Sequence, residues 1–304
     1  MSTLPALIVI EGTNASGKSG LAVELAARFG GEIVSADSRQ VFRGLDLGSG
    51  KITPDEMKGV KHHLIDVCEP GAFFSMHDFQ RLAYEAIEDI RARGRTPFLV
   101  GGTGLYVASV TEGYVMSDRA PDLAYRAELE TCDTPALYRM LREKLPDIEI
   151  DASNRNRVMR ALEKLHDGDD FTAKREPRYD CLKLGVTWER QTLRRRIDER
   201  LARRVSDGMV DEVRRLMAQG VSVEFLKKLG LEYRFIAQYL TGEIPSEGEM
   251  LALLATAIKQ FAKRQMIWFR RDRAIRWLDM SGDPVAEASA LIGPFLAAHG
   301  EAGA

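Results

Sequence analysis

The stretch Leu7-Ile8-Val9-Ile10-Glu11 runs directly into Gly12-Thr13-Asn14-Ala15-Ser16-Gly17-Lys18-Ser19 near the start of the chain. The apolar first part predicts a buried parallel strand, and the apolar spacing of residues 21–29 predicts a helix after the glycine loop. A G-x-x-x-x-G-K-S loop between a strand and a helix points backbone N–H groups and the helix N-terminus at phosphate oxygens. Lys18 would add a positive charge, and Ser19 a hydroxyl for Mg²⁺. The sequence therefore predicts a site for a diphosphate or triphosphate, and it leaves open whether that phosphate belongs to a nucleotide.

Composition restricts the class of protein. The chain has 304 residues, 45% apolar and 29% charged, which allows one large domain or a domain with a sizeable insertion. Its cysteines, Cys68, Cys132 and Cys181, lie far apart, so neither a disulfide framework nor a structural zinc site is expected. No segment is typical of a signal peptide or a membrane span, and we expect a cytoplasmic monomer that contacts no membrane. The net charge of −2 excludes a chain that is basic throughout, so any nucleic-acid surface must be local.

Further apolar runs predict strands at 32–38, 62–67, 96–100, 181–186 and 275–278, with helical patterns between them. Ser75 and Asp78 have the spacing of a helix cap, and the helix after them is expected to reach Ile90. Strands that alternate with helices predict a doubly wound parallel sheet. The fold class is therefore α/β.

Two turns follow predicted strands at the edge of the sheet where the phosphate loop lies. The strand at 32–38 ends in Asp37 and Ser38, and the strand at 96–100 is followed by Gly101-Gly102-Thr103-Gly104. Ligands of open parallel sheets bind beyond the carboxyl ends of the strands, so both turns are candidates for the site. The residue types alone also allow a turn aspartate at Asp37 and a helix cap at Thr103.

Residues 117–180 change in character, because prolines punctuate short amphipathic helices and apolar strands are absent. We interpret them as a helical insertion into a core formed by residues 1–116 and 181–304. Within the insertion, Arg157 and Arg160 lie three residues apart on one helix face, as a phosphate-contacting pair requires. A solvated helix face is the alternative interpretation.

Two later segments are rich in basic residues. The arginines between residues 194 and 204 are offset in part by acidic residues, which favours a solvated helix from which one or two arginines turn inward. The segment 259–276 is less balanced and interleaves Phe261, Trp268 and Phe269 with basic residues, a pattern that fits either a nucleic-acid surface or core aromatics.

With these pieces placed, the sequence resembles the tRNA dimethylallyltransferases of bacterial type, also called tRNA isopentenyltransferases. The resemblance runs along nearly the whole chain and rests on five motifs in the family's order. These are the glycine loop 12–19, Asp37-Ser38-Arg39-Gln40 with Gly44-Leu45-Asp46-Leu47-Gly48, residues 99–106, Arg157–Glu163 and Ala262–Arg270.

The resemblance implies transfer of a dimethylallyl group from dimethylallyl diphosphate to the N6 amine of the adenosine 3′-adjacent to the anticodon of tRNA. It implies a P-loop NTPase-like core in which the loop 12–19 holds the donor diphosphate with Mg²⁺ bound by Ser19, while the insertion acts as a lid that binds the anticodon stem-loop. Asp37 would be the general base, Thr103 would lie beside the leaving group, and Arg196 would contact the diphosphate. Matching positions for tRNA binding are Asp37, Ser38, Arg39, Gln40, Thr103, Arg126, Asn156, Arg157, Val158, Met159, Arg160, Lys259, Lys263 and Arg264.

The chain departs from the family pattern at a few positions. Glu232-Tyr233-Arg234-Phe235 stands where G-Y-x-Q is usual, Lys259 replaces a common arginine, and Phe42 replaces a common tyrosine. We expect the first two changes to lie in regions that face tRNA. The zinc finger of eukaryotic relatives is absent, in agreement with the cysteine count.

Three other functions use some of the same residues. A nucleotide kinase would use the loop for ATP, and an adenylate prenyltransferase would share the loop and Asp37 but would not need the basic segments. An RNA-binding or GTPase-like switch protein would leave Asp37 and the turn at Thr103 without a task, and the sequence lacks an N-K-x-D guanine-reading motif.

Overall fold

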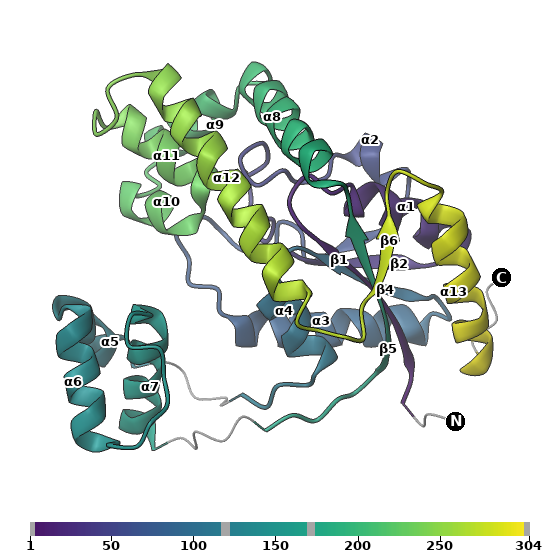
Figure 1. Cartoon of the computed structure of the whole chain (residues 1–304), viewed down its shortest axis with the longest axis horizontal. Coiled ribbons are helices and arrows are strands. Elements are labelled where there is room, and N and C mark those ends of the chain that lie inside the picture. Colours follow the sequence, from purple (N-terminus) through teal and green to yellow (C-terminus); the bar gives the residue numbers. More distant parts are fainter. Residues whose placement is uncertain (1–3, 117–121, 169–173, 301–304) are drawn as a thin grey trace. The chain divides into compact units, whose positions relative to one another are not determined.

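The structure, a computed structural model, describes residues 4–116, 122–168 and 174–300. They form two compact units, one of residues 1–113 with 177–304 and one of residues 114–176 (Figure 1). The predicted limits of the insertion are residues 117 and 180; residue 117 lies outside the described residues, and residue 180 already belongs to a strand of the first unit.

The first unit contains a six-stranded sheet in which every neighbouring pair is parallel. Its strand order is β3-β2-β4-β1-β5-β6. The strands are β1 (Ala6–Gly12), β2 (Glu32–Ala36), β3 (His62–His63), β4 (Pro97–Gly101), β5 (Asp180–Thr187) and β6 (Arg276–Asp279). The predicted doubly wound α/β fold is therefore confirmed, with β1 and its glycine loop at the centre of the sheet.

The helices of the first unit cover the sheet and build an additional helical layer (Figure 1). They are α1 (Lys18–Arg28), α2 (Pro54–Met57), α3 (Met76–Ala92), α4 (Gly104–Thr111), α8 (Arg190–Ser206), α9 (Met209–Ala218), α10 (Val223–Leu229), α11 (Leu231–Leu240), α12 (Glu247–Phe269) and α13 (Pro284–Ala298). The predicted cap of α3 is present, because the Ser75 hydroxyl accepts the Asp78 N–H while the Asp78 carboxylate accepts the Ser75 N–H.

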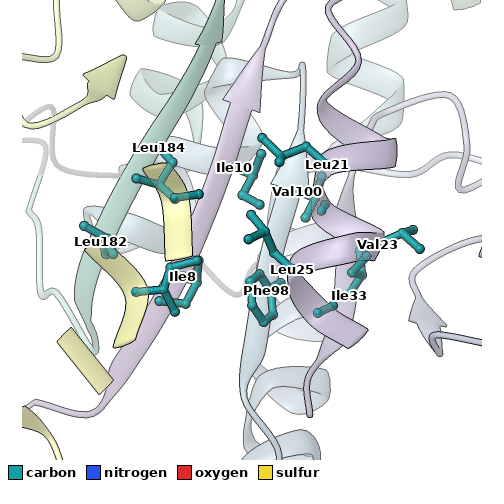
Figure 2. Close-up of a cluster of buried hydrophobic side chains, with 14 of the residues drawn as sticks. Ile8, Ile10, Leu21, Val23, Leu25, Ile33, Phe98, Val100, Leu182 and Leu184 are labelled. Atoms are coloured by element: carbon teal, nitrogen blue, oxygen red, sulfur yellow. The ribbon is translucent and has the colours of Figure 1, made fainter. Parts of the chain in front are cut away.

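The alternation of side chains along the strands divides the core into two layers. On one face, Ile8 and Ile10 of β1 pack with residues of α1 and α13, as Figure 2 shows for part of this layer. On the other face, Leu7 and Val9 pack with α3 and α4. Burial on both faces explains why β1 is apolar at consecutive positions and not at alternate ones.

The predicted strand 62–67 is much shorter in the structure and ends at His63. Leu64 and Asp66 have φ angles of 63° and 56°, in the left-handed region, which interrupts an extended strand. Apolar composition alone could not reveal this turn.

The second unit is a small helical body of α5 (Leu123–Thr131), α6 (Thr134–Lys144) and α7 (Arg155–Asp167). Each helix begins with a side-chain cap, from Asp122, Asp133 and Asn154 respectively. Its own apolar core includes Leu129, Leu137, Leu141, Val158 and Leu162.

A buried carboxylate at the start of β2 stabilises the sheet at the end opposite the glycine loop. Glu32 is 4% exposed, and it accepts hydrogen bonds from both terminal nitrogens of Arg93 and contacts His63 Nε2 at 2.7 Å. The hydrogen bonds from Arg93, supported by His63 and opposed by burial, lower the pKa of Glu32 to about 2. Its ionised form is therefore favoured in the folded chain.

We expect Glu32→Gln to lower the free energy of unfolding by about 2 kcal/mol at pH 7, with the partial exposure of Arg93 taken into account. Because the folded pKa lies below that of an unfolded glutamate, this contribution is present above about pH 4.3 and is lost toward pH 2. Denaturant unfolding at pH 7 and pH 3 tests this prediction. We expect the difference in the free energy of unfolding between the wild type and Glu32→Gln to be about half as large at pH 3 as at pH 7. Glu24→Gln, at an exposed carboxylate, is the control, and an equal Glu32 effect at both pH values would contradict the assignment.

Candidate active site

The loop between β1 and α1 is shaped by two glycines. A Cβ atom on Gly12 would lie 2.7 Å from Val186 Cγ2, so β5 approaches too closely for any other residue. Gly17 has φ 90° and caps α1, which places the positive end of this helix at the loop. Two side chains hold the loop from the β5–α8 side: Trp188 Nε1–H donates to Ser16 O at 2.8 Å, and Arg196 Nε–H donates to Ala15 O at 3.0 Å.

A cavity of about 280 Å³ opens over this loop, and we call it the loop pocket. One wall is the loop itself from Asn14 to Gly20, and the other is a face of α8 that carries Arg196, Arg200 and Arg204 at four-residue spacing. Of these three arginines, only Arg196 was predicted by number, beside the expectation that one or two arginines of this segment turn inward. The spacing of four was the available signal for the other two arginines.

The electrostatics of the loop pocket favour a multiply charged anion. Burial lowers the pKa of Lys18 to about 8; Asp37 opposes this shift, while Arg200, Arg39 and Arg204 add to it. Burial and Arg204 likewise lower the pKa of Arg200 to about 10. A bound anion would relieve the repulsion among these cations.

Asp37 and Thr103 lie together at the carboxyl ends of the adjacent strands β2 and β4. Asp37 is 9% exposed, and its Oδ1 accepts the Arg39 N–H at 3.0 Å. Thr103 Oγ1 accepts the Ser38 N–H at 3.2 Å, which ties the two turns to each other. Lys18, Ser19 and Asp37 also line one small cavity between the turns and the loop.

Another cavity, of about 470 Å³, meets the loop pocket at Asn14 and Asp37, which line both. We call it the aromatic pocket, because Phe261, Trp268 and Phe269 of α12 form one wall. Ser38, Thr103 and Arg264 also line it. Gly104 makes the close approach of α12 possible, since a Cβ atom there would lie 2.3 Å from Trp268 Nε1.

The residues of the departure at 232–235 differ in their exposure, because Arg234 is exposed and lines the aromatic pocket, whereas Glu232 and Tyr233 are buried. Glu232 is 3% exposed and forms ion pairs with Arg39 at 2.7 Å and with Arg204 at 3.6 Å. Tyr233 is fully buried, and its hydroxyl donates to Glu212 Oε1 at 3.0 Å. The Glu212 carboxylate also accepts the N–H groups of residues 46–48, so the buried Glu232 and Tyr233 stabilise segments next to the loop pocket.

Arg39 and Gln40, two expected tRNA contacts, are held by protein groups. The Arg39 guanidinium is bound to the buried Glu232. The Gln40 side chain donates to Gly50 O at 3.3 Å and accepts the Ser35 hydroxyl at 3.2 Å. Ser38 lines the aromatic pocket itself.

The remaining expected tRNA contacts lie in three places. On α7, Asn156, Arg157 and Arg160 are exposed, whereas the side chains of Val158 and Met159 are buried in the core of the second unit. Arg126 and Arg160 both pair with Glu163. Lys259 and Lys263 line a separate cavity between α8 and α12, and Lys259 pairs with Asp198 at 2.6 Å. Of these basic residues, Arg264 alone lines the aromatic pocket.

Among the described residues there is no group of three or more histidine, cysteine, aspartate or glutamate side chains that could hold a metal ion. In the same part of the chain, no helix is both long and apolar enough to cross a membrane.

Comparison with known proteins identifies the family. The profile of the IPP transferases matches residues 40–272. A tRNA dimethylallyltransferase 2 from Pelobacter propionicus is 47% identical over 294 residues, which cover 94% of this chain and 93% of the relative. The chain belongs to the tRNA dimethylallyltransferase (IPP transferase) family. The predicted resemblance and the predicted enzyme class, a prenyltransferase, are therefore confirmed.

Solved structures of the same family share the fold. The full-length tRNA isopentenylpyrophosphate transferase of Bacillus halodurans superimposes with a TM-score of 0.74 at 37% identity and covers 97% of this chain and 98% of its own. A eukaryotic dimethylallyltransferase, described as acting on tRNA, superimposes with a TM-score of 0.77 at 25% identity and covers 97% of this chain and 79% of its own.

Proposed function

We propose that this chain transfers the dimethylallyl group of dimethylallyl diphosphate to the N6 amine of the adenosine 3′-adjacent to the anticodon of a tRNA. The observation that supports this most is the meeting of two unlike pockets at Asp37 and Asn14. The loop pocket presents the glycine loop, Lys18 and the α8 arginines and suits a diphosphate, and the aromatic pocket suits a base. A carboxylate lies where the two substrates would meet.

In the proposed reaction the N6 lone pair attacks C1 of the donor, and the bond between C1 and the diphosphate oxygen breaks. The diphosphate leaves with the electron pair of that bond, and Asp37 accepts the proton that N6 loses. An exocyclic adenine amine is a weak nucleophile because its lone pair is delocalised into the ring, so a positioned base is needed. Thr103, whose Oγ1 accepts the Ser38 N–H beside Asp37, would lie beside the leaving group, as the family resemblance implies.

The donor diphosphate would lie on the N–H groups at the start of α1, with Lys18, Arg196 and Arg200 neutralising the charge that develops on it. The site of the diphosphate suits Mg²⁺, because Ser19 and Asp37 offer oxygen ligands at one small cavity. Phosphate oxygens of the substrate normally complete the coordination of such an ion. When bound, the ion would stabilise the leaving diphosphate. ATP has no part in this reaction.

The acceptor base would have to leave the anticodon-loop stack to reach the aromatic pocket, at a cost of a few kcal/mol. Stacking on an aromatic side chain returns about 1–3 kcal/mol per base, and Trp268 and Phe261 offer such faces. We therefore assign the exposed side of α12 around Arg264 and Trp268 to the acceptor.

Two tRNA transcripts that differ at a single position test this function. One carries adenosine 3′ of the anticodon, and the other carries inosine, which has an oxygen in place of the N6 amine. With labelled dimethylallyl diphosphate and Mg²⁺, we expect label in the adenosine transcript alone. Equal label in both transcripts would show that the acceptor is another atom.

The exposed arginines of α7 give a separate prediction about tRNA binding. We expect the double variant Arg157→Gln with Arg160→Gln to weaken tRNA binding about tenfold and to lower the slope of log K against log salt by about 1.4, as for two lost phosphate contacts. Filter binding at several salt concentrations measures both. Arg139→Gln with Arg142→Gln removes the same charge from α6 of the same unit and should have a smaller effect. Equal effects of the two double variants would indicate that only the net charge of this unit matters.

A further inference from the structure

Gln265 of α12 lies where the elements that would carry the donor and the base come together, and no role was predicted for it from the sequence. We propose that Gln265 is a positioning residue that fixes the distance between the donor diphosphate and the general base. This inference rests on the proposed function, because it assumes a donor on the glycine loop and a base at Asp37.

The carboxamide of Gln265 makes one hydrogen bond to each side of the site. Its Oε1 accepts the Asn14 N–H of the glycine loop at 3.0 Å. Its Nε2 donates to Gly102 O, in the turn after β4, at 2.9 Å. A glutamine suits this place because a single planar group supplies an acceptor and a donor in opposite directions.

From Gly102 the connection continues to the base. The next residue, Thr103, accepts the Ser38 N–H at 3.2 Å, and Ser38 follows Asp37 directly. The Thr103 N–H also donates to Ala36 O at 3.3 Å, which fixes the same turn from the other side of Asp37. One set of hydrogen bonds thus links the loop that would hold the donor to the carboxylate that would take the proton.

Burial separates Gln265 from its neighbours on α12. Gln265 is 7% exposed, while Trp268 is 37% exposed and Arg264 is also exposed. Both polar atoms of its carboxamide are already bonded to main-chain groups. Gln265 is therefore suited to hold the site together, whereas Arg264 and Trp268 are suited to contact the acceptor.

The expected consequence is a loss of rate with both substrates still bound. Displacing reacting groups by about 1 Å can cost on the order of 10²-fold in rate. We expect Gln265→Met, which keeps the length of the side chain and removes both hydrogen bonds, to lower the single-turnover rate about 10²-fold at saturating tRNA and donor. Gln265 lines the aromatic pocket, but it is 7% exposed and both polar atoms of its carboxamide are bonded to main-chain groups. The Kd for tRNA should therefore stay within about threefold of the wild-type value. Gln219→Met, the same change at an exposed glutamine after α9, is the control and should leave rate and affinity unchanged.

A double variant separates positioning from general damage to the fold. If Gln265 acts through the turn at Thr103, then Gln265→Met combined with Thr103→Val should be about as slow as the slower single variant. Multiplied losses would show that the two residues act independently and would overturn the proposal. A Gln265→Met enzyme with the wild-type single-turnover rate, or with a rate restored by excess tRNA, would overturn it as well. If wild-type enzyme transfers no label to tRNA, it is the proposed function that fails.

Discussion

Replacing Asp37 by alanine is expected to lower the turnover number by roughly 10²–10⁴-fold, the usual contribution of a positioned general base. Asp37 lies at the junction of the loop pocket and the aromatic pocket, where the donor carbon and the N6 amine would meet. Most of the surface that would bind tRNA lies elsewhere, so the Kd for tRNA should change little. Steady-state turnover and filter binding on the same preparation measure the two quantities.

Asp37→Asn is the matched variant, because an amide oxygen can still accept the Arg39 N–H that Asp37 Oδ1 accepts at 3.0 Å. It keeps the turn and removes the base. We therefore expect Asp37→Asn to be about as slow as Asp37→Ala. An asparagine variant with near-normal turnover would show that Asp37 shapes the turn and takes no proton.

The second large effect is expected at Lys18. Lys18→Met should lower kcat/KM for the donor about 10³-fold, because it removes a cation from the place where charge develops on the leaving diphosphate. Arg196, Arg200 and Arg204 also line the loop pocket and would still bind the donor. We therefore expect donor binding to weaken, and the chemical step to slow by a larger factor. Single-turnover rates at increasing donor concentration separate the two effects.

Lys58→Met provides the control for Lys18, because Lys58 is an exposed lysine of the same unit, paired only loosely with Glu24 at 3.7 Å. This variant should match the wild type. If saturating donor restored the full rate of Lys18→Met, Lys18 would contribute only to binding of the donor in the ground state. Its assigned role in the transition state would then be wrong.

The glycine loop and the parallel sheet could be predicted because their signals are local. Leu7–Ile10 shows its burial on both faces as consecutive apolar residues, and the loop carries its chemistry in eight successive positions. Asp37 and Thr103 could be placed near the loop because parallel strands end at one edge of the sheet.

The supports of the site were not predictable in the same way, because they depend on contacts distant in sequence. Glu232 binds Arg39 across 193 positions and Gln265 binds the Asn14 N–H across 251, and no local pattern marks a buried carboxylate or amide. The family motif places Val158 and Met159 with the exposed arginines around them, although helical periodicity turns these two side chains to the core of the second unit. A continuous motif on a helix includes residues of both its exposed and its buried face.

The most direct measurement uses purified protein with Mg²⁺ and labelled dimethylallyl diphosphate, offered either unmodified tRNA or free AMP, with and without ATP. The proposed function predicts label in the tRNA at the adenosine beside the anticodon, without ATP, and none in AMP. Label in AMP alone would assign the chain to free-nucleotide chemistry, and transfer only with ATP present would contradict the role given to the glycine loop.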